Sequence, residues 1–228
     1  MPSHRRLACK LNYFQSIILM FAAVILIGAA LLMLPISAQE RTVTPFHEAL
    51  FTATSAVCVT GLVVRDTASH WSAFGQAVLM VLIQIGGLGV ITVGASFSLL
   101  SGRRISLSQR GRMQEAMSAP KVGGIVRLTG FVIRASLMIE GIGALCMLPV
   151  FCRDFGVSGI WKAVFHSVSA FCNAGFDLMG INEPFSSLTR YSADPIVTLT
   201  VSALIIVGGI GFFVWRDLCQ NKLHFKKY

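Results

Sequence analysis

The chain has 228 residues, of which 54% are hydrophobic and only 13% are charged, and its mean hydropathy is +0.72. A soluble domain would carry roughly twice that share of charged residues, so this composition excludes an ordinary soluble protein and indicates a polytopic protein surrounded by membrane lipid. The formal net charge of +9 then has to be interpreted by its location along the chain, and it gives no reason to expect a nucleic-acid partner.

The first hundred residues predict a helix, a short re-entrant helix and a second helix. Residues 14–35 and about 73–100 are each long and apolar enough to cross the bilayer. Between them, Thr44 and Pro45 are typical of a helix start, with a hydroxyl at the N-cap and proline at the first helical position. The helix that they begin, at about residues 45–57, spans only about 18 Å at about 1.5 Å per residue. It cannot cross the hydrocarbon, so the chain must turn back through a strand-like turn.

The same order of elements recurs after a basic segment that is expected to lie in the cytoplasm. The second set comprises a span at about 128–152, a short helix at about 158–171, a turn, and a span at about 195–215. We therefore expect an all-α membrane protein with four transmembrane helices and two short pore helices, arranged as two helix–re-entrant pore loop–helix repeats. The expected first repeat, basic cytoplasmic linker, second repeat and basic cytoplasmic tail occupy residues 1–100, 101–127, 128–218 and 219–228.

The short segments between the spans match each other at an offset of 114 residues. Six identities support this offset: Ala49/Ala163, Phe51/Phe165, Ser55/Ser169, Ala56/Ala170, Cys58/Cys172 and Gly61/Gly175. Lipid does not tolerate non-helical backbone unless that backbone is buried in protein or lines an aqueous path. A duplicated irregular segment between membrane helices therefore indicates the lining of a pore.

Glycine at the centre of each duplicated segment suggests how such a pore would hold an ion. A dehydrated monovalent cation needs several oxygen ligands, and backbone carbonyls supply them where glycine permits unusual dihedral angles. The alternative is a glycine turn in a re-entrant hairpin that lines nothing. The candidate ion ligands are the main-chain carbonyls of Cys58, Val59, Thr60, Gly61, Cys172, Asn173, Ala174 and Gly175.

A Gly-Gly-x-Gly pattern occurs in the second span of each repeat, although glycine costs roughly 1 kcal/mol at each position of a helix in water. Such glycines let another backbone approach closely, which is a sufficient explanation for them. A hinge or gate on the cytoplasmic half of the pore is the alternative. The residues concerned are Gly86, Gly87, Gly89, Gly208, Gly209 and Gly211.

Charged residues set the expected orientation. Thirteen of the 19 lysines and arginines lie before the first span, in the central linker or after the last span, so both termini are expected in the cytoplasm. Seven of the ten acidic residues fall on the outer side, where they either raise the local cation concentration or form a solvated loop surface. Arg134 and Glu140 lie within a span on different helix faces; separate structural pairing is favoured, and a functional role is the alternative.

Six cysteines show no C-x-x-C spacing, so neither a metal cluster nor a secreted disulfide framework is expected. Cys58 and Cys172 are the only pair at equivalent positions. The preferred interpretation is that these positions need a small residue so that another backbone can approach closely. The alternative is a membrane thiol or redox protein that uses the two cysteines. No base, nucleophile and acid converge with His47 or His166, so the chain is not expected to be an enzyme.

The segments Ser55–Leu62 and Ser169–Phe176, the Gly-Gly-x-Gly spans and the linker sequence Arg104-Ile105-Ser106-Leu107 resemble the Trk/Ktr/HKT superfamily of potassium transporters. They are most similar to the membrane subunit of its Ktr branch. The resemblance implies potassium uptake across the plasma membrane, here the bacterial inner membrane, through a backbone-carbonyl selectivity filter. Potassium, or also sodium, would be the transported or coupling ion, with no covalently bound cofactor. The residues that match the family's filter glycines are Gly61 and Gly175.

The resemblance is to the N-terminal half of such transporters, because family members have four repeats around one pore and this chain contains two. It implies that these repeats pair with repeats three and four or with a second copy of the chain. It also implies a homodimer and a cytosolic nucleotide-binding regulatory subunit. The alternative is a truncated product that does not conduct ions.

Overall fold

The computed structural model describes residues 13–89, 125–181, 183–211 and 214–215. These residues form helices joined by irregular loops and contain no strand; Ala38 and Trp71 make an isolated antiparallel bridge. The expected all-α architecture is thus confirmed for this part of the chain. The helices are α1 (Tyr13–Met33), η1 (Pro35–Ser37), α2 (Phe46–Val57), α3 (Thr67–His70), α4 (Ala73–Leu88), α7 (Ile125–Phe155), α8 (Ser158–Phe171), η2 (Thr189–Tyr191) and α9 (Pro195–Ile210).

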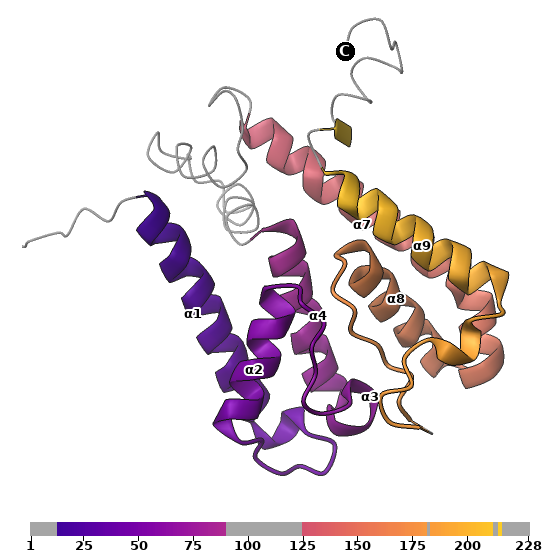
Figure 1. Ribbon diagram of the computed structural model, residues 1–228, viewed down its shortest axis with the longest axis horizontal. Coiled ribbons are helices and arrows are strands. Elements are labelled where there is room, and N and C mark those ends of the chain that lie inside the picture. The colour runs from indigo at the N-terminus through magenta and orange to yellow at the C-terminus, as the bar shows by residue number, and fades with distance from the viewer. Residues whose placement is uncertain (1–12, 90–124, 182, 212–213, 216–228) are drawn as a thin grey trace, which may run out of the picture.

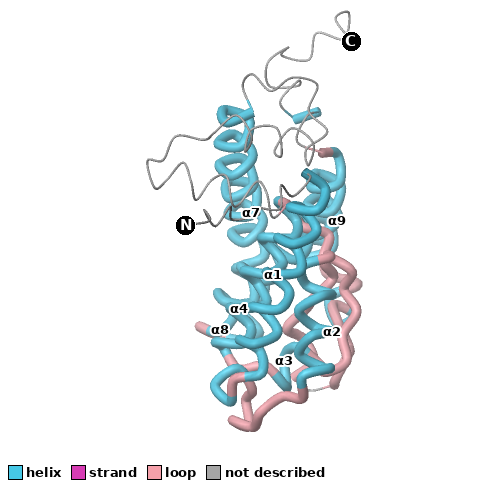
Figure 2. Tube along the Cα trace, turned by 90° about the vertical axis from the view of Figure 1, so that its left-hand side faces the viewer, coloured by secondary structure: helices cyan, strands magenta, loops and turns pink. Residues whose placement is uncertain are grey.

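Two helical units lie side by side (Figure 1). In the first unit α2 packs against α1 and α4, and in the second unit α8 packs against α7 and α9 in the same order. The two units contact each other through α4 and α8. Most of the connecting loops lie at the end of the bundle where α1 ends and α4 begins (Figure 2). The short helices α2 and α8 are therefore both enclosed by longer helices of their own unit.

By length and composition, one helical segment in the described part of the chain, Thr129–Phe155, can cross a membrane. The other long elements are shorter apolar helices, Ile17–Met33, Ala73–Leu88 and Pro195–Ile210. The predicted second and fourth spans extended further than α4 and α9 do. Each of these helices ends at a glycine with positive φ, Gly89 (φ +82°) and Gly211 (φ +91°), a backbone conformation that glycine adopts far more readily than other residues. Residues 90–100, most of the predicted linker and the predicted tail lie outside the described residues.

Glycine lets α4 and α9 approach the ends of the short helices. A Cβ atom on Gly86 would overlap the carbonyl oxygen of Val57, and one on Gly208 would overlap that of Phe171. Val57 and Phe171 are the last residues of α2 and α8, so the same backbone contact is made in both units. In contrast, a Cβ atom on Gly209 would have no neighbour within 4 Å.

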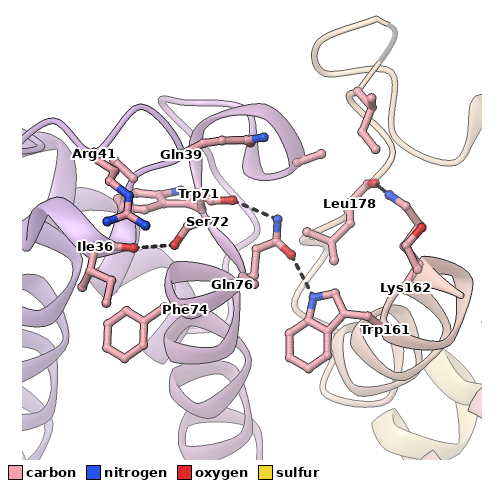
Figure 3. A pocket seen from close by; sticks show the side chains of 15 residues that line it. Ile36, Gln39, Arg41, Trp71, Ser72, Phe74, Gln76, Trp161, Lys162 and Leu178 are labelled. Atoms are coloured by element: carbon pink, nitrogen blue, oxygen red, sulfur yellow. Dashed lines mark hydrogen bonds between the residues drawn. The ribbon is translucent and has the colours of Figure 1, made fainter.

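The units are joined, at the end where α1 ends and α4 begins, by hydrogen bonds between side chains and loops. Gln76 of α4 accepts a hydrogen bond from the indole Nε1 of Trp161 on α8 (2.8 Å) beside a cavity of about 560 Å³ (Figure 3). Asp66 caps α3 through Oδ1, and its Oδ2 accepts a hydrogen bond from the backbone N–H of Phe185 (2.8 Å). Asp66 is only 7% exposed, so these bonds lie away from competing water.

We expect Gly86→Ala and Gly208→Ala each to destabilise the protein by about 1–3 kcal/mol, because the added methyl group forces α2 away from α4 or α8 away from α9. Gly130→Ala, also within a helix, is the matched control and should behave like the parent chain, because the space beside Gly130 is open. Thermal unfolding in detergent, followed by size-exclusion chromatography, measures the difference. Equal melting temperatures for all three variants would contradict the close contact.

Asp66→Ala should destabilise the chain by about 1–3 kcal/mol, because it removes the cap of α3 and leaves the N–H of Phe185 without its acceptor. Glu48→Ala, which breaks an ion pair with the half-exposed Arg65, should have a much smaller effect. The same thermal assay compares the two. The account of the junction fails if removal of Glu48 is as damaging as removal of Asp66.

Candidate functional site

The loops after α2 and α8 both fold back onto the helix that precedes them. The N–H of Thr60 donates to the carbonyl of Ser55 (2.9 Å), and the N–H of Ala174 donates to the carbonyl of Ser169 (2.8 Å). These donors are 114 positions apart, and so are their acceptors. Because the N–H groups are used in this way, the loops pair with no neighbouring strand. The strand-like turns predicted at these positions are therefore irregular loops.

Left-handed backbone occurs at the same two positions of each loop. Val59 and Gly61 have φ values of +56° and +74°, and Asn173 and Gly175 have values of +58° and +73°. Glycine adopts this region freely, whereas for a β-branched valine it is a genuine outlier. Strain of this kind persists only where the surroundings impose it, and it concentrates at functional sites. The duplication seen in the sequence is therefore also a duplication of unusual backbone geometry.

The two loops meet at their glycines. A Cβ atom on Gly61 would lie 2.5 Å from the carbonyl oxygen of Ala174 and 3.4 Å from Cα of Gly175. A Cβ atom on Gly175 would lie 3.6 Å from Cα of Gly61. Both loops run along the junction between the two units (Figure 1). Residues far apart in the sequence thus form one contiguous stretch of main chain, and a side chain at position 61 would separate its halves.

The eight candidate carbonyl oxygens, at residues 58–61 and 172–175, accept no hydrogen bond from any described residue. Immediately after them, the carbonyl of Phe176 accepts a hydrogen bond from the hydroxyl of Ser169 (2.6 Å). The described residues also contain no group of three or more His, Cys, Asp or Glu side chains placed to hold a metal ion. Uncommitted main-chain oxygens are therefore the acceptors that this junction offers to a cation.

A buried lysine and histidine hold the segment that follows the second loop. The imidazole of His166 bridges two backbone groups, the carbonyl of Lys162 (2.7 Å) at Nδ1 and the N–H of Leu178 (3.2 Å) at Nε2. An acceptor at Nε2 requires the neutral ring with its proton on Nδ1, and burial lowers the pKa of His166 to about 4. The ammonium group of Lys162 donates to the carbonyl of Leu178 (Figure 3). His166 is therefore a brace for the loop, a role that the sequence interpretation missed.

Cys58 and Cys172 are both free thiols, but they differ in burial. Cys58 is exposed, whereas Cys172 is buried at the junction, where a Cβ atom on Gly87 would lie 2.5 Å from its sulfur. In the second unit this position therefore packs against the neighbouring unit, which agrees with the preferred interpretation of a small residue at a close approach.

Most of the acidic residues that were predicted on the outer side have structural partners. Five of the seven accept hydrogen bonds from helix N-termini, loop N–H groups or neighbouring side chains, and they are Glu48, Asp66, Asp154, Asp177 and Asp194. Caps and ion pairs of this kind stabilise the outer loops, whatever their effect on ions. The structural interpretation of these charges is thus favoured over an acidic mouth that concentrates cations.

Comparison with known proteins gives the family. The family model described as a cation transport protein, TrkH, matches residues 6–227. The chain is 42% identical over 215 residues to the potassium/sodium uptake protein NtpJ of Enterococcus hirae, covering 94% of this chain and 47% of that protein. It is 43% identical over 203 residues to the Ktr system potassium uptake protein B of Bacillus subtilis, covering 89% and 44%. The protein of the same name from Vibrio alginolyticus is 37% identical over 222 residues, covering 96% and 47%.

The chain spans about half the length of these relatives, all of which are named as cation uptake proteins rather than enzymes. The match to the family model covers nearly the whole chain, including both glycine loops and both Gly-Gly-x-Gly helices. The chain therefore belongs to the TrkH family of cation transport proteins.

Proposed function

We propose that this chain forms part of a membrane pore for the uptake of potassium, or also sodium, and that the carbonyl oxygens of residues 58–61 and 172–175 line its selectivity filter. The observation that carries the proposal is the meeting of two loops of identical backbone geometry at Gly61 and Gly175. The names of the relatives, which describe potassium or potassium/sodium uptake, support the choice of ion.

The backbone of each loop suits this task. Alternation of φ sign along the loop turns successive peptide groups toward the same side, so that their oxygens can replace part of the hydration shell of an ion. The N–H groups of Thr60 and Ala174 are already bonded to the preceding helices, which leaves the opposite side of each peptide for the ion. Glycine at positions 61 and 175 lets the two rows of oxygens approach a common axis.

Two loops supply only part of a ring of ligands. Within the chain, Gly87 of the first unit packs against Cys172 of the second, whereas their counterparts Gly209 and Cys58 are uncovered. The uncovered surfaces at Gly209 and Cys58 support an assembly in which further units make the contact that Gly87 and Cys172 make within the chain. These units would be repeats three and four or a second copy of the chain. A homodimer, a cytosolic nucleotide-binding regulatory subunit and cytoplasmic termini belong to the same proposal.

A bacterial strain that lacks potassium uptake tests the proposal. The chain is expressed alone and joined to the C-terminal half of a Ktr relative, and growth is measured against external potassium. We expect at least one form to restore growth at low potassium. Gly61→Ala and Gly175→Ala should raise the potassium concentration required by roughly tenfold or more, because a side chain enters the row of carbonyl ligands.

Gly156→Ala is the matched control, because Gly156 also has left-handed backbone (φ +60°) but nothing within 4 Å of its Cβ position. It should restore growth like the parent chain at equal protein levels in the membrane. The proposal is overturned if the joined protein never restores growth, or if the Gly61 and Gly175 variants restore it as well as the control.

A further inference from the structure

A carboxyl group and a carboxamide meet at the junction of the two units, deep within the helices. Nε2 of Gln84, on α4 of the first unit, donates a hydrogen bond to Oε1 of Glu140, on α7 of the second unit (2.8 Å). The hydroxyl of Ser167 on α8 donates to the backbone carbonyl of Glu140 (2.6 Å). Glu140 is 5% exposed. The first unit therefore holds the carboxyl group of Glu140, and the second unit, to which Glu140 belongs, holds its backbone.

The fold of a unit does not require this pair. At the offset that relates the two units, the counterpart of Glu140 is Leu26, and the counterpart of Ser167 is Ala53. Alignment through the Gly-Gly-x-Gly motifs places Ile206 opposite Gln84. Leu26 and Ile206 are exposed apolar residues on their helices. The polar pair thus occurs only where the two units meet.

The carboxyl group has no basic partner among the described residues. Arg134, the other charge on this part of α7, is exposed on a different face of the helix. A cavity of about 330 Å³ lies beside Glu140 and Gln84, and its other lining residues are apolar or glycine. A buried carboxylate without a countercharge is strongly disfavoured in such surroundings. Without a countercharge such a carboxyl group keeps its proton, and a cation nearby would favour its ionised form.

The pair lies close behind the second candidate filter loop. Gln84 and Gly87 are one helical turn apart on α4, so the face that binds Glu140 also packs against Cys172, the first residue of that loop. Ser167, which binds the backbone of Glu140, lies five positions before Cys172. The Cys172 thiol is the other titratable group that these contacts bring to this part of the junction.

We propose that Glu140 is a positioning residue for the permeating cation. Its carboxylate, oriented by Gln84, supplies a fixed negative charge behind residues 172–175 and lowers the energy of a cation bound to their carbonyl oxygens. This inference rests on the proposed function, since it requires an ion in that loop.

The test is the concentration dependence of rubidium uptake, in whichever form of the chain restores potassium uptake. Glu140→Gln preserves size and hydrogen bonding but removes the charge. We expect it to raise KM roughly three- to thirtyfold, the effect of one unit charge acting through a partly buried medium, with little change in maximal rate. Exchange of the two residues, Glu140→Gln with Gln84→Glu, should restore KM toward the parent value. Leu26→Gln, at the counterpart position, should leave KM unchanged.

An unchanged KM for Glu140→Gln at a normal protein level overturns the inference. Should that variant not reach the membrane, Glu140→Leu combined with Gln84→Leu provides an uncharged apolar pair. A raised KM in this double variant supports the role of the charge, and a parent-like KM refutes it. Failure of the filter itself is recognised separately, because the Gly61 and Gly175 variants would then retain uptake.

Discussion

The need of every buried peptide N–H group for a partner governs this structure. In both loops that follow a short helix, the first three N–H groups are satisfied by carbonyls of that same helix, as in the bonds from Thr60 to Ser55 and from Ala174 to Ser169. This arrangement forces left-handed backbone at alternate residues and leaves the loop carbonyls without donors among the described residues. Acceptors that lack a donor in the described part of the chain, gathered where two loops touch, are what a weakly hydrated cation can use.

Close packing of backbone against backbone holds those loops in place. Gly86 and Gly208 admit the last carbonyls of α2 and α8, so that each short helix is fixed against the long helix that follows it. Polar contacts then distinguish the two units from each other. The second has the buried His166 brace where the first has Thr52, and it contributes Glu140 to the junction bond with Gln84 where the first has Leu26. In the proposed pore, the ligands from the two units would therefore be alike but their surroundings would differ.

The sequence predicted the helices well, because their signals are local. Apolar length and the 114-residue offset gave α1, α2, α7 and α8 to within a few residues. The predicted N-cap of α2 was wrong, because Pro45 occupies that position and the hydroxyl of Thr44 is hydrogen-bonded to His70 instead. The ends of α4 at Gly89 and of α9 at Gly211 were not predicted. A glycine within an apolar run does not reveal whether it packs against another helix or has a positive φ that ends its own helix. The partners of Glu140, His166 and Lys162 were missed because Gln84 and Leu178 reach them only through tertiary packing. The one feature of the sequence that could have pointed to these contacts was a polar residue in an otherwise apolar helix.

The central claim is that main-chain oxygens of the two loops bind the transported ion. The most direct measurement is the anomalous scattering of thallium or rubidium in crystals of the assembly that restores potassium uptake. The account predicts an ion peak on the axis between Gly61 and Gly175, surrounded by carbonyl oxygens of residues 58–61 and 172–175. Ion density confined to carboxylate side chains, with none between the two glycines, would contradict it.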